Sequence, residues 1–502
     1  MKRIVIIGGG ISGLAAAHRL VELRKKTGIE FEITLLEASS RLGGVIQTDH
    51  RHGFLLERGP DSFISEKPAT LELARRIGLE THLIETNREH RRSFVVQNGK
   101  LRPVPEGFYL IAPARFRPWL SSDIFSWTGK ARMAMDLLLP RRITNGSDDE
   151  SLANFVRRRL GREALERMAQ PMVGGIYTAD PEKLSLRATI PRFLEMERTH
   201  GSVIRGLKEE NASVSSVSRW LINLKRAFTT ETQKTLTKDA LTLKRDASGP
   251  RYSLFLSFDR GMQILVDALA ARLPRNAIRL NVAVASIRLE RDPNRWIIET
   301  GSNESVQADA LCVALPAHAA AKLFDPTDPI LANELKAIPY ASTATINLAY
   351  RREQIPHSLD GFGFVVPFIE KRSLLACSFS SVKFAGRAPE CHTLLRAFVG
   401  GALQPEVLRL DESEIIERVR NDLRELLSIR EPPLFAELSR WASSMPQYEV
   451  GHLSRLSRIS DRVVQLPALK LAGNAYHGVG IPDCISSGEN AADELAFLLR
   501  IS

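Results

Sequence analysis

A run of apolar residues that leads directly into glycines constrains the fold of this chain more than any other feature. Residues 4–15 read IVIIGGGISGLA, and Ile4–Ile7 has the β-branched character of a strand buried on both faces of a parallel sheet. Gly8, Gly10 and Gly13 follow the G-x-G-x-x-G spacing of a strand-to-helix turn. In such a turn the first glycine makes the bend, the second lets the backbone approach a pyrophosphate, and the third lets helix and strand pack closely. We therefore expect an α/β fold with a dinucleotide site.

The residues after this turn extend the same pattern. The helix expected at Leu14–Arg24 would present free N–H groups and a positive dipole end to a phosphate. Glu30–Leu36 alternates as a second strand and leads to Glu37, about 20 positions past the glycines, where an acidic residue binds a ribose 2′-hydroxyl. Glu37 could instead be a solvated strand end, but the spacing favours the ribose role.

The overall composition narrows the class of protein. The chain has 502 residues, which predicts two or three domains. Its formal net charge of +11 favours acidic partners: nucleic acid, an anionic membrane surface or a polyanionic small molecule. Nucleic acid is the least favoured, because the chain has neither zinc-ligand spacing nor an RNA-recognition motif.

Cysteine usage and hydropathy bear on the compartment. The four cysteines contain no C-x-x-C pair, which argues against a structural metal site or a disulfide framework and fits a reducing cytosol. No signal-peptide pattern precedes the first strand, and no run of 18 uncharged apolar residues occurs. We expect a cytoplasmic protein whose membrane contact, if any, is peripheral to the inner face of the cell membrane.

Nucleotide-binding signals recur far along the chain, so one domain is expected to be assembled from separated segments. Ser40–Gly44 (SRLGG) and Glu57–Phe63 (ERGPDSF) are glycine turns near the first site, and Leu469–Gly473 is a short apolar strand near the end. The middle of the chain contains a helix-rich basic region, a polar stretch at 203–251 expected to be a mobile loop, and strand-like alternations that suit a mixed sheet floored by helices. The expected boundaries are 1–90, 255–315 and 437–502 for the nucleotide-binding domain, 91–104 and 316–436 for a substrate domain, and 105–254 for a helical subdomain.

Four stretches together carry a resemblance to a known family. They are IIGGGISGLAAA (6–17), ERGPDSF (57–63), MPQYEVGH (445–452) and GVGIPDCISSGE (478–489), supported by NGKLRPVP (98–105), PMVGGIYTADPEKLSL (171–186) and SFDRGMQILVDAL (257–269). The chain resembles the flavin-dependent porphyrinogen oxidases, which belong to the amine-oxidase-like flavoproteins and oxidise protoporphyrinogen IX or coproporphyrinogen III. The resemblance covers nearly the whole chain and is weakest at 205–251.

The resemblance implies a noncovalent FAD and a set of residues along it. The pyrophosphate would lie on the first glycine turn and the adenosine beside Glu37 and the backbone of a valine. The isoalloxazine would lie between the second glycine turn and the C-terminal loop. The matched positions are Gly8, Gly9, Gly10, Ile11, Ser12, Gly13, Leu14, Glu37, Ala38, Arg41, Gly43, Gly44, Gly59, Pro60, Asp61, Ser62, Val282, Trp441, Gly473, Val479, Gly480 and Ile481.

The resemblance also implies the reaction. Six electrons leave the porphyrinogen in three two-electron steps, each a hydride transfer from a methine-bridge carbon to flavin N5, and dioxygen is reduced to hydrogen peroxide. The cofactor supplies this chemistry and the protein orients and shields it, so neither a metal nor a Ser/His/Asp constellation is expected. His477 near the flavin suggests a catalytic role, although a tolerated loop neighbour is the favoured interpretation.

The substrate needs an apolar slot with cationic ends, because its macrocycle is apolar and its propionates are anionic. The resemblance implies that Val365 and Phe384 are wall positions and that Gly174, Gly175 and Ile176 face the substrate near N5. It also implies that the basic residues Lys67 and Arg102 pair with propionates. Each basic residue could instead be a solvated charge, and Phe384 could be core.

Several questions stay open at the level of sequence. Most motifs resemble the bacterial branch that favours coproporphyrinogen III, whereas Arg102 resembles the protoporphyrinogen branch. Product hand-off to a ferrochelatase is compatible with either substrate. An amine or carotenoid oxidoreductase, with Cys484 near a covalent flavin, and a non-catalytic carrier on the same fold remain alternatives.

The helical subdomain could face a membrane through Gly107–Ile124, with Phe108, Tyr109, Phe116 and Trp119 in the interface and Arg115 and Arg117 toward anionic lipid.

Overall fold

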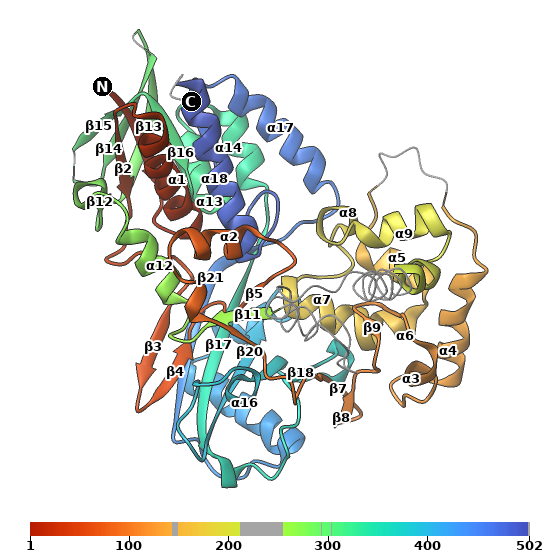
Figure 1. The fold of residues 1–502 in the computed structure, drawn as a ribbon. Helices are drawn as coiled ribbons and strands as arrows, with labels where there is room; N and C mark the ends of the chain where they lie inside the picture. The colour runs from red at the N-terminus through yellow and green to blue at the C-terminus, as the bar shows by residue number, and fades with distance from the viewer. Residues whose placement is uncertain (143–148, 211–254, 293, 303, 500–502) are drawn as a thin grey trace, which may run out of the picture.

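A parallel sheet lies at the end of the molecule that carries both termini (Figure 1). The structure, a computed structural model, describes residues 1–142, 149–210, 255–292, 294–302 and 304–499. Among these residues, five strands form the parallel sheet in the order β12-β2-β1-β16-β22. Their bounds are Ile278–Arg279 (β12), Phe31–Leu36 (β2), Lys2–Ile7 (β1), Ala310–Val313 (β16) and Leu469–Leu471 (β22). Strands from the beginning, middle and end of the chain therefore interleave, which confirms the α/β domain built from separated segments.

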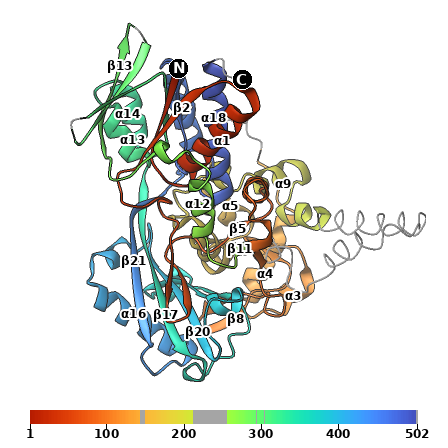
Figure 2. The same cartoon turned by 60° about the vertical axis from the view of Figure 1, so that its left-hand side comes forward.

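Both faces of the parallel sheet are covered, as the apolar run of β1 predicts. Ile4 and Ile6 belong to one buried cluster, whereas Val5 and Ile7 belong to another on the opposite face. The first face carries α1 and α18, which lie side by side in Figures 1 and 2, together with α2 and α12. The second face carries α13, α14, α17 and an antiparallel sheet of β13, β14 and β15. The bounds are Ile11–Thr27 (α1), Ala69–Arg76 (α2), Gln263–Ala270 (α12), Ala317–Phe324 (α13), Pro329–Lys336 (α14), His452–Val464 (α17), Ile481–Leu498 (α18), Val284–Arg291 (β13), Asn294–Thr300 (β14) and Ser305–Ala308 (β15).

A mixed sheet forms the lower part of Figure 1. Seven strands of the described residues pair in the order β21-β17-β20-β19-β18-β7-β8, and only the β18–β7 pair is parallel. One face of β17 buries Ala344, Ile346 and Leu348 against α16, which confirms a mixed sheet floored by a helix. The bounds are Phe94–Gln97 (β7), Lys100–Pro103 (β8), Tyr340–Arg351 (β17), Gly363–Val365 (β18), Leu374–Phe379 (β19), His392–Gly400 (β20), Phe435–Pro446 (β21) and Glu412–Leu427 (α16).

Two domain boundaries differ from those expected. The strand β21 pairs along its length with β17, so residues 435–446 lie in the mixed sheet rather than with the parallel sheet. Helices α13 and α14 bury their apolar faces against Val5 and Ile7, so residues 317–336 lie with the parallel sheet rather than with the mixed sheet. Both differences arise because apolar patterning marks a helix or strand as buried without marking the sheet on which it packs.

A helical subdomain with its own core lies to the right in Figure 1. Phe108 and Trp119 are buried in that core, so the prediction that these two aromatic side chains face a membrane is wrong. Of the predicted mobile loop, residues 203–210 are helical, and residues 211–254 lie outside the described residues. No described helix combines the length and the apolar character that a membrane span requires. The principal helices are Phe116–Leu120 (α3), Trp127–Ala134 (α4), Leu152–Arg159 (α5), Gln170–Tyr177 (α7), Leu186–Thr189 (α8) and Arg192–His200 (α9).

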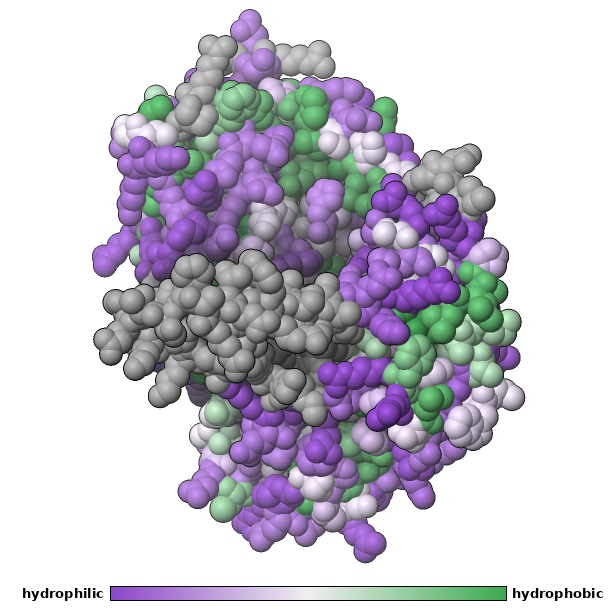
Figure 3. Space-filling view, turned by 45° about the vertical axis from the view of Figure 1, so that its right-hand side comes forward, coloured by the Kyte–Doolittle hydropathy of each residue, from purple (hydrophilic) through white to green (hydrophobic). Residues whose placement is uncertain are grey.

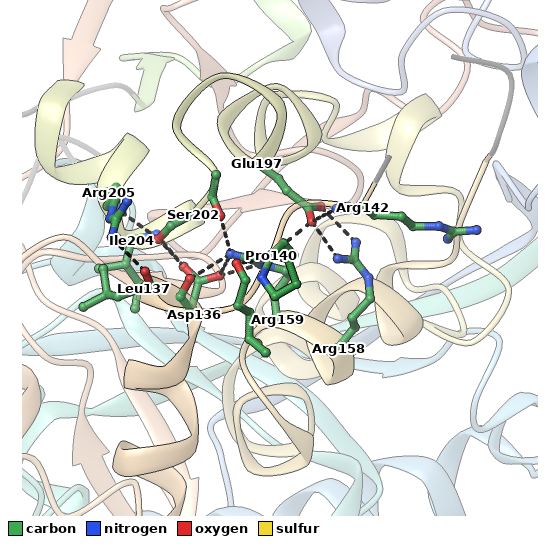
Figure 4. A network of polar contacts seen from close by, with 12 residues as sticks. Asp136, Leu137, Pro140, Arg142, Arg158, Arg159, Glu197, Ser202, Ile204 and Arg205 are labelled. Carbon is green, nitrogen blue, oxygen red and sulfur yellow. Dashed lines mark hydrogen bonds and ion pairs between the residues drawn. The ribbon is translucent and has the colours of Figure 1, made fainter. Parts of the chain in front are cut away.

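A buried ion pair joins distant segments of this subdomain (Figure 4). Arg159 Nε donates to Asp136 Oδ1 at 2.6 Å, and both side chains are almost fully buried. The second oxygen, Asp136 Oδ2, accepts from Ser202 Oγ at 2.6 Å and from the N–H of Ile204 at 3.0 Å. Arg159 Nη2 also donates to the carbonyl of Gly201. A buried charge pair is tolerated when its remaining donors and acceptors are satisfied, as they are here.

Candidate functional site

The first glycine turn forms an open cradle at the end of β1. Gly8 has φ +108°, and a Cβ on Gly13 would lie 1.9 Å from the carbonyl oxygen of Gly8. By contrast, a Cβ on Gly10 would have no neighbour within 4 Å. Helix α1 begins at Ile11 without a side-chain cap, so its first N–H groups face this open space. The turn therefore fits a pyrophosphate at the helix N-terminus.

The second glycine pair lies beside the first turn. Gly43 donates its N–H to the carbonyl of Gly9 at 2.8 Å, and Gly44 has φ +58°. The guanidinium of Arg41 donates to carbonyls of its own loop, Leu42 and Ile46 at 3.2 Å and also Gly44. In the structure the Arg41 guanidinium therefore stabilises the glycine loop through its backbone carbonyls. A phosphate contact by Arg41 stays a prediction.

Glu37 follows β2 at the adenosine end of the expected cofactor site. Its Oε2 accepts from the N–H of Gly9 at 2.6 Å, and its Oε1 accepts from the N–H of Ser39 at 2.8 Å. Val282 donates its N–H to the carbonyl of Glu37 at 2.9 Å. The structure therefore brings Glu37, Ala38 and Val282 together beside the phosphate turn, where a ribose and an adenine would lie.

The turn predicted to face the flavin, Gly59–Ser62, is fixed from behind by the mixed sheet. Side chains of that sheet donate to three consecutive backbone carbonyls at the start of the turn. The carbonyl of Glu57 accepts from Asn347 Nδ2 at 3.1 Å, and the carbonyl of Gly59 accepts from Arg396. The carbonyl of Arg58 accepts from both Thr345 Oγ1 at 2.7 Å and Trp441 Nε1 at 3.0 Å. A Cβ on Gly59 would lie 1.7 Å from the carbonyl oxygen of Val45, so only glycine fits. Trp441 therefore supports the turn through its indole nitrogen.

Buried charges surround the same turn. Lys383 Nζ lies 2.9 Å from Asp61 Oδ2 and 3.2 Å from Ser62 Oγ. Burial raises the pKa of Asp61, but Lys383 and Arg396 outweigh it and hold that pKa below its usual value. Burial raises the pKa of Glu57 to about 7, although Thr48 and the N–H of Met262 donate to its carboxylate.

The supporting roles of Asn347, Lys383 and Arg396 were not predicted from the sequence. The one available signal was a lone arginine inside the otherwise apolar strand TLLRAFVG (393–400). Such a residue is either an edge charge or a buried charge with a partner, and pattern alone does not distinguish these.

The C-terminal loop closes the site from the other side. Gly473 has φ +135° and donates its N–H to Ser487 Oγ at 3.0 Å. Gly480 precedes α18 and donates its N–H to Asp483 Oδ2 at 3.2 Å. His477 is exposed on the turn before Val479, and its interpretation as a loop neighbour stays a prediction.

Cys484 lies in the first turn of α18 and is buried in the core of the parallel-sheet domain. Burial raises the pKa of its thiol to about 12, so the thiolate needed for covalent attachment is disfavoured. We expect acid precipitation to release all flavin into the supernatant, leaving a colourless pellet. Yellow colour retained in the pellet would contradict noncovalent binding.

Four of the predicted substrate residues surround one region between the domains. Lys67 Nζ lies 2.6 Å from Asp483 Oδ1 and keeps 53% of its side chain exposed. Gly175 and Ile176 are exposed at the end of α7, and a Cβ on Gly175 would lie 3.8 Å from Val365 Cγ1. Adjacent residues join the two groups: Gln447 donates to the carbonyl of Tyr177 at the end of α7, and Tyr448 accepts from the N–H of Gly478 in the loop before Asp483.

The other two predicted substrate residues lie elsewhere. Arg102 is in the edge strand β8, its guanidinium 3.6 Å from Asp123 Oδ2, and the buried Val95 separates it from Val365 across the sheet. Phe384 is 1% exposed, with its ring covered by Lys383 and Arg387. Phe384 thus lies in the core rather than on an open wall, and the pairing of Arg102 with a propionate stays a prediction.

The comparisons with known proteins agree with this geometry. The model of the family described as flavin containing amine oxidoreductase matches residues 11–496. The chain is 34% identical to coproporphyrinogen III oxidase of Bacillus subtilis over 99% of its own length and 98% of that protein. It is 31% identical to chloroplastic protoporphyrinogen oxidase of Nicotiana tabacum over 99% of its own length and 86% of that protein.

Solved structures show the same fold. A protein of Exiguobacterium, provisionally named a protoporphyrinogen oxidase, superposes with a TM-score of 0.82 at 30% identity, covering 99% of each chain. A putrescine oxidase superposes with a TM-score of 0.66 at 16% identity, which is evidence for the fold alone. The phosphate cradle, the glycine turns and the full-length match together show that the chain belongs to the flavin-containing amine oxidoreductases.

Proposed function

We propose that this protein is an FAD-dependent porphyrinogen oxidase of heme biosynthesis, with dioxygen as the oxidant. The observation that carries the proposal is full-length identity of 32–34% with three proteins named coproporphyrinogen III oxidase. The open cradle at Gly10 and the cation at Lys67 support it, because they suit a dinucleotide and an anionic substrate. Six hydrogens would leave the substrate while three dioxygen molecules become three hydrogen peroxide molecules.

Coproporphyrinogen III is the substrate we favour. The chain is 26–31% identical to the protoporphyrinogen oxidases of plants, less than to the bacterial coproporphyrinogen III oxidases. The one residue that resembles the protoporphyrinogen branch is Arg102, and in the structure its guanidinium lies 3.6 Å from Asp123 Oδ2. Coproporphyrin III, the product, would then pass to a ferrochelatase-type enzyme that inserts iron.

When bound, FAD would accept hydride from the substrate; the residues of this chain would bind and orient both molecules. The N-terminus of α1 would hold the pyrophosphate, and Glu37 the ribose. The Gly59–Ser62 turn and the loop at Val479–Ile481 would fix the isoalloxazine, and α7 would exclude water from the cleft. Proximity and orientation alone contribute about 7–11 kcal/mol in well-aligned reactions, so no side-chain acid or base need be assigned.

An anaerobic reaction distinguishes this proposal from an amine oxidoreductase. Mixing the FAD-loaded protein with coproporphyrinogen III without dioxygen should bleach the visible flavin absorbance, and admitting air should restore it. Putrescine should leave the absorbance unchanged. Bleaching by putrescine and not by coproporphyrinogen III would favour the amine oxidoreductase.

Because the Lys67 side chain is partly exposed, its substitution should have a moderate effect on substrate binding. In Lys67→Met the charge that would pair with a propionate is lost, and a partly exposed pair of this kind contributes about 1 kcal/mol. The KM for coproporphyrinogen III should therefore rise about fivefold while the flavin spectrum stays unchanged. Arg102→Met is the matched control and should leave KM unchanged. Equal effects of the two substitutions would contradict the placement of the anchor at Lys67.

We also propose peripheral membrane contact, at a different face from the buried aromatics. A surface groove of about 580 Å³ in the helical subdomain is lined by Leu120, Trp127, Arg117 and Lys130. Trp127 is 73% exposed, and the Lys130 ammonium lies 4.4 Å from the centroid of its ring. Figure 3 shows hydrophobic residues gathered among hydrophilic ones at the right-hand side of the face drawn there. The exposed hydrophobic residues of the helical subdomain include Leu120, Met135 and Leu138. Aromatic and basic side chains together suit an anionic lipid surface.

Flotation with phosphatidylglycerol vesicles tests the membrane proposal. The protein should float at low salt and largely dissociate at high salt, and Trp127→Ala should reduce flotation several-fold. Phe497→Ala, which removes a similarly exposed aromatic ring from α18, is the control and should behave as wild type. Absence of flotation at low salt would overturn the proposal.

A further inference from the structure

We propose that Gln447 and Tyr448 are positioning residues that set the separation of the two walls of the cleft. These consecutive residues follow β21, and both are buried. Tyr448 bonds the loop expected on the flavin side, and Gln447 bonds the end of the helix expected on the substrate side. The inference rests on the proposed function, because it takes the two walls to be those of a flavin and a porphyrinogen.

Tyr448 fixes the flavin-side loop through its hydroxyl group. The hydroxyl donates to the carbonyl of Asn474 at 2.5 Å and accepts from the N–H of Gly478 at 2.9 Å. The ring stacks on His452, with centroids 4.1 Å apart and an interplanar angle of 11°. His452 Nε2 in turn lies 3.3 Å from the carbonyl oxygen of Tyr476. Two stacked rings therefore bond three backbone groups of the segment that leads directly into Val479–Ile481.

Gln447 fixes the substrate-side wall through its amide group. Its Nε2 donates to the carbonyl of Tyr177 at 3.2 Å and to the carbonyl of Met445 at 3.1 Å. Tyr177 is the last residue of α7, the helix on which the predicted substrate residues Gly175 and Ile176 are exposed. The end of α7 and the flavin-side loop are thus bonded to adjacent residues of one short segment.

The segment that carries the two residues is itself anchored on both sides. Gln447 donates its N–H to the carbonyl of Pro339 at 2.8 Å, which ties it to the beginning of β17. Ser185 donates its N–H to the carbonyl of Tyr448, and Val450 donates its N–H to the carbonyl of Lys183, each at 2.8 Å. The segment is therefore bonded to the mixed sheet and to the helical subdomain, so it cannot shift without moving one of the walls.

A fixed separation matters because hydride transfer depends steeply on geometry. Reacting atoms must lie about 3–3.5 Å apart, and a 1 Å displacement can cost roughly a hundredfold in rate. A porphyrinogen is a flexible macrocycle, so the walls must supply the alignment that the substrate lacks. Neither residue touches the reacting atoms; each acts through the backbone that it holds.

The experiment uses FAD-loaded full-length protein and two matched pairs of variants. Tyr448→Phe removes a hydroxyl with two hydrogen bonds, whereas Tyr476→Phe removes a buried hydroxyl that has no partner among the described residues. Gln447→Met and Gln404→Met each remove a buried amide that donates to a backbone carbonyl, but Gln404 bonds Arg372, just before β19, rather than the end of α7. The measurements are the Kd for FAD, the visible flavin spectrum and midpoint potential, and the Kd for coproporphyrin III.

Tyr448→Phe should shift the flavin spectrum and potential and weaken FAD about tenfold. Complete loss of FAD would also support the inference, provided that an unchanged far-ultraviolet circular dichroism spectrum shows that the variant is folded. Gln447→Met should leave the flavin spectrum unchanged and weaken coproporphyrin III about fivefold, and both control variants should match wild type.

The inference would be overturned if Tyr448→Phe and Tyr476→Phe had the same flavin spectrum, midpoint potential and Kd for FAD. Unchanged binding of coproporphyrin III by Gln447→Met would also overturn it. Wild-type protein that binds FAD but not coproporphyrin III would instead contradict the proposed function and the Gln447 half of the inference. The Tyr448 half is decided by FAD alone.

Discussion

Gly10→Glu is expected to purify folded but colourless. A Cβ at position 10 meets no atom within 4 Å, and the backbone there has φ −69°, so the fold accepts a side chain. The glutamate would occupy the pyrophosphate position and repel it, and like charges placed together cost several kcal/mol. A cost of about 3 kcal/mol corresponds to a roughly hundredfold higher Kd for FAD.

The control for this variant is Gly301→Glu, which adds the same charge on an exposed turn where a Cβ makes only an ordinary contact at 3.7 Å. It should bind FAD as wild type does. Titration of both apoproteins with FAD, followed by the quenching of flavin fluorescence, gives the two constants. Full FAD binding by Gly10→Glu would mean that the cofactor does not lie on the first glycine turn.

Arg159→Met is expected to lower the free energy of unfolding of the helical subdomain by about 3–5 kcal/mol. The substitution leaves the Asp136 carboxylate buried without its cation, and breaking a buried pair from one side has a cost of this size. Arg162→Met removes an exposed arginine paired with Glu166 and should leave the stability nearly unchanged, because solvent screens an exposed pair. Thermal and urea unfolding, followed by circular dichroism, compare the two variants.

A second substitution separates the ion pair from packing. Adding Asp136→Asn to Arg159→Met removes the uncompensated charge, so the double variant should recover part of the lost stability. If Arg159→Met were as stable as Arg162→Met, the network of Figure 4 would contribute nothing to the subdomain.

The phosphate site could be predicted from sequence because its determinants are local. Strand, turn and helix are contiguous in residues 2–27, and the glycines are required by contacts within that unit, such as Gly13 against the carbonyl of Gly8. The role of Glu37 could be predicted in the same way, because only α1 and β2 lie between the turn and this residue in the chain. Local patterning is sufficient wherever the partners are close in the chain.

The substrate side could be predicted only in part because it depends on long-range pairing. Arg102 and Val365 lie on the same row of the mixed sheet, but only the pairing through Val95 reveals that a buried residue separates them. Trp119 was assigned to a surface because its stretch is aromatic and basic, whereas the three-dimensional packing turns its ring into the subdomain core. Gln447 and Tyr448 lie in the recognised motif MPQYEVGH. Their hydrogen bonds to Tyr177 and Asn474 could not be predicted, because these partners are far from the motif in the sequence.

The stoichiometry of aerobic turnover tests the central claim most directly. FAD-loaded protein is mixed with coproporphyrinogen III in air, and porphyrin fluorescence and hydrogen peroxide are measured in the same sample. Removal of six electrons by dioxygen predicts three molecules of hydrogen peroxide for each molecule of coproporphyrin III formed, at a rate that the Gly10→Glu variant does not support. Porphyrin formation no faster than in buffer, by protein that carries its full complement of FAD, would contradict the account.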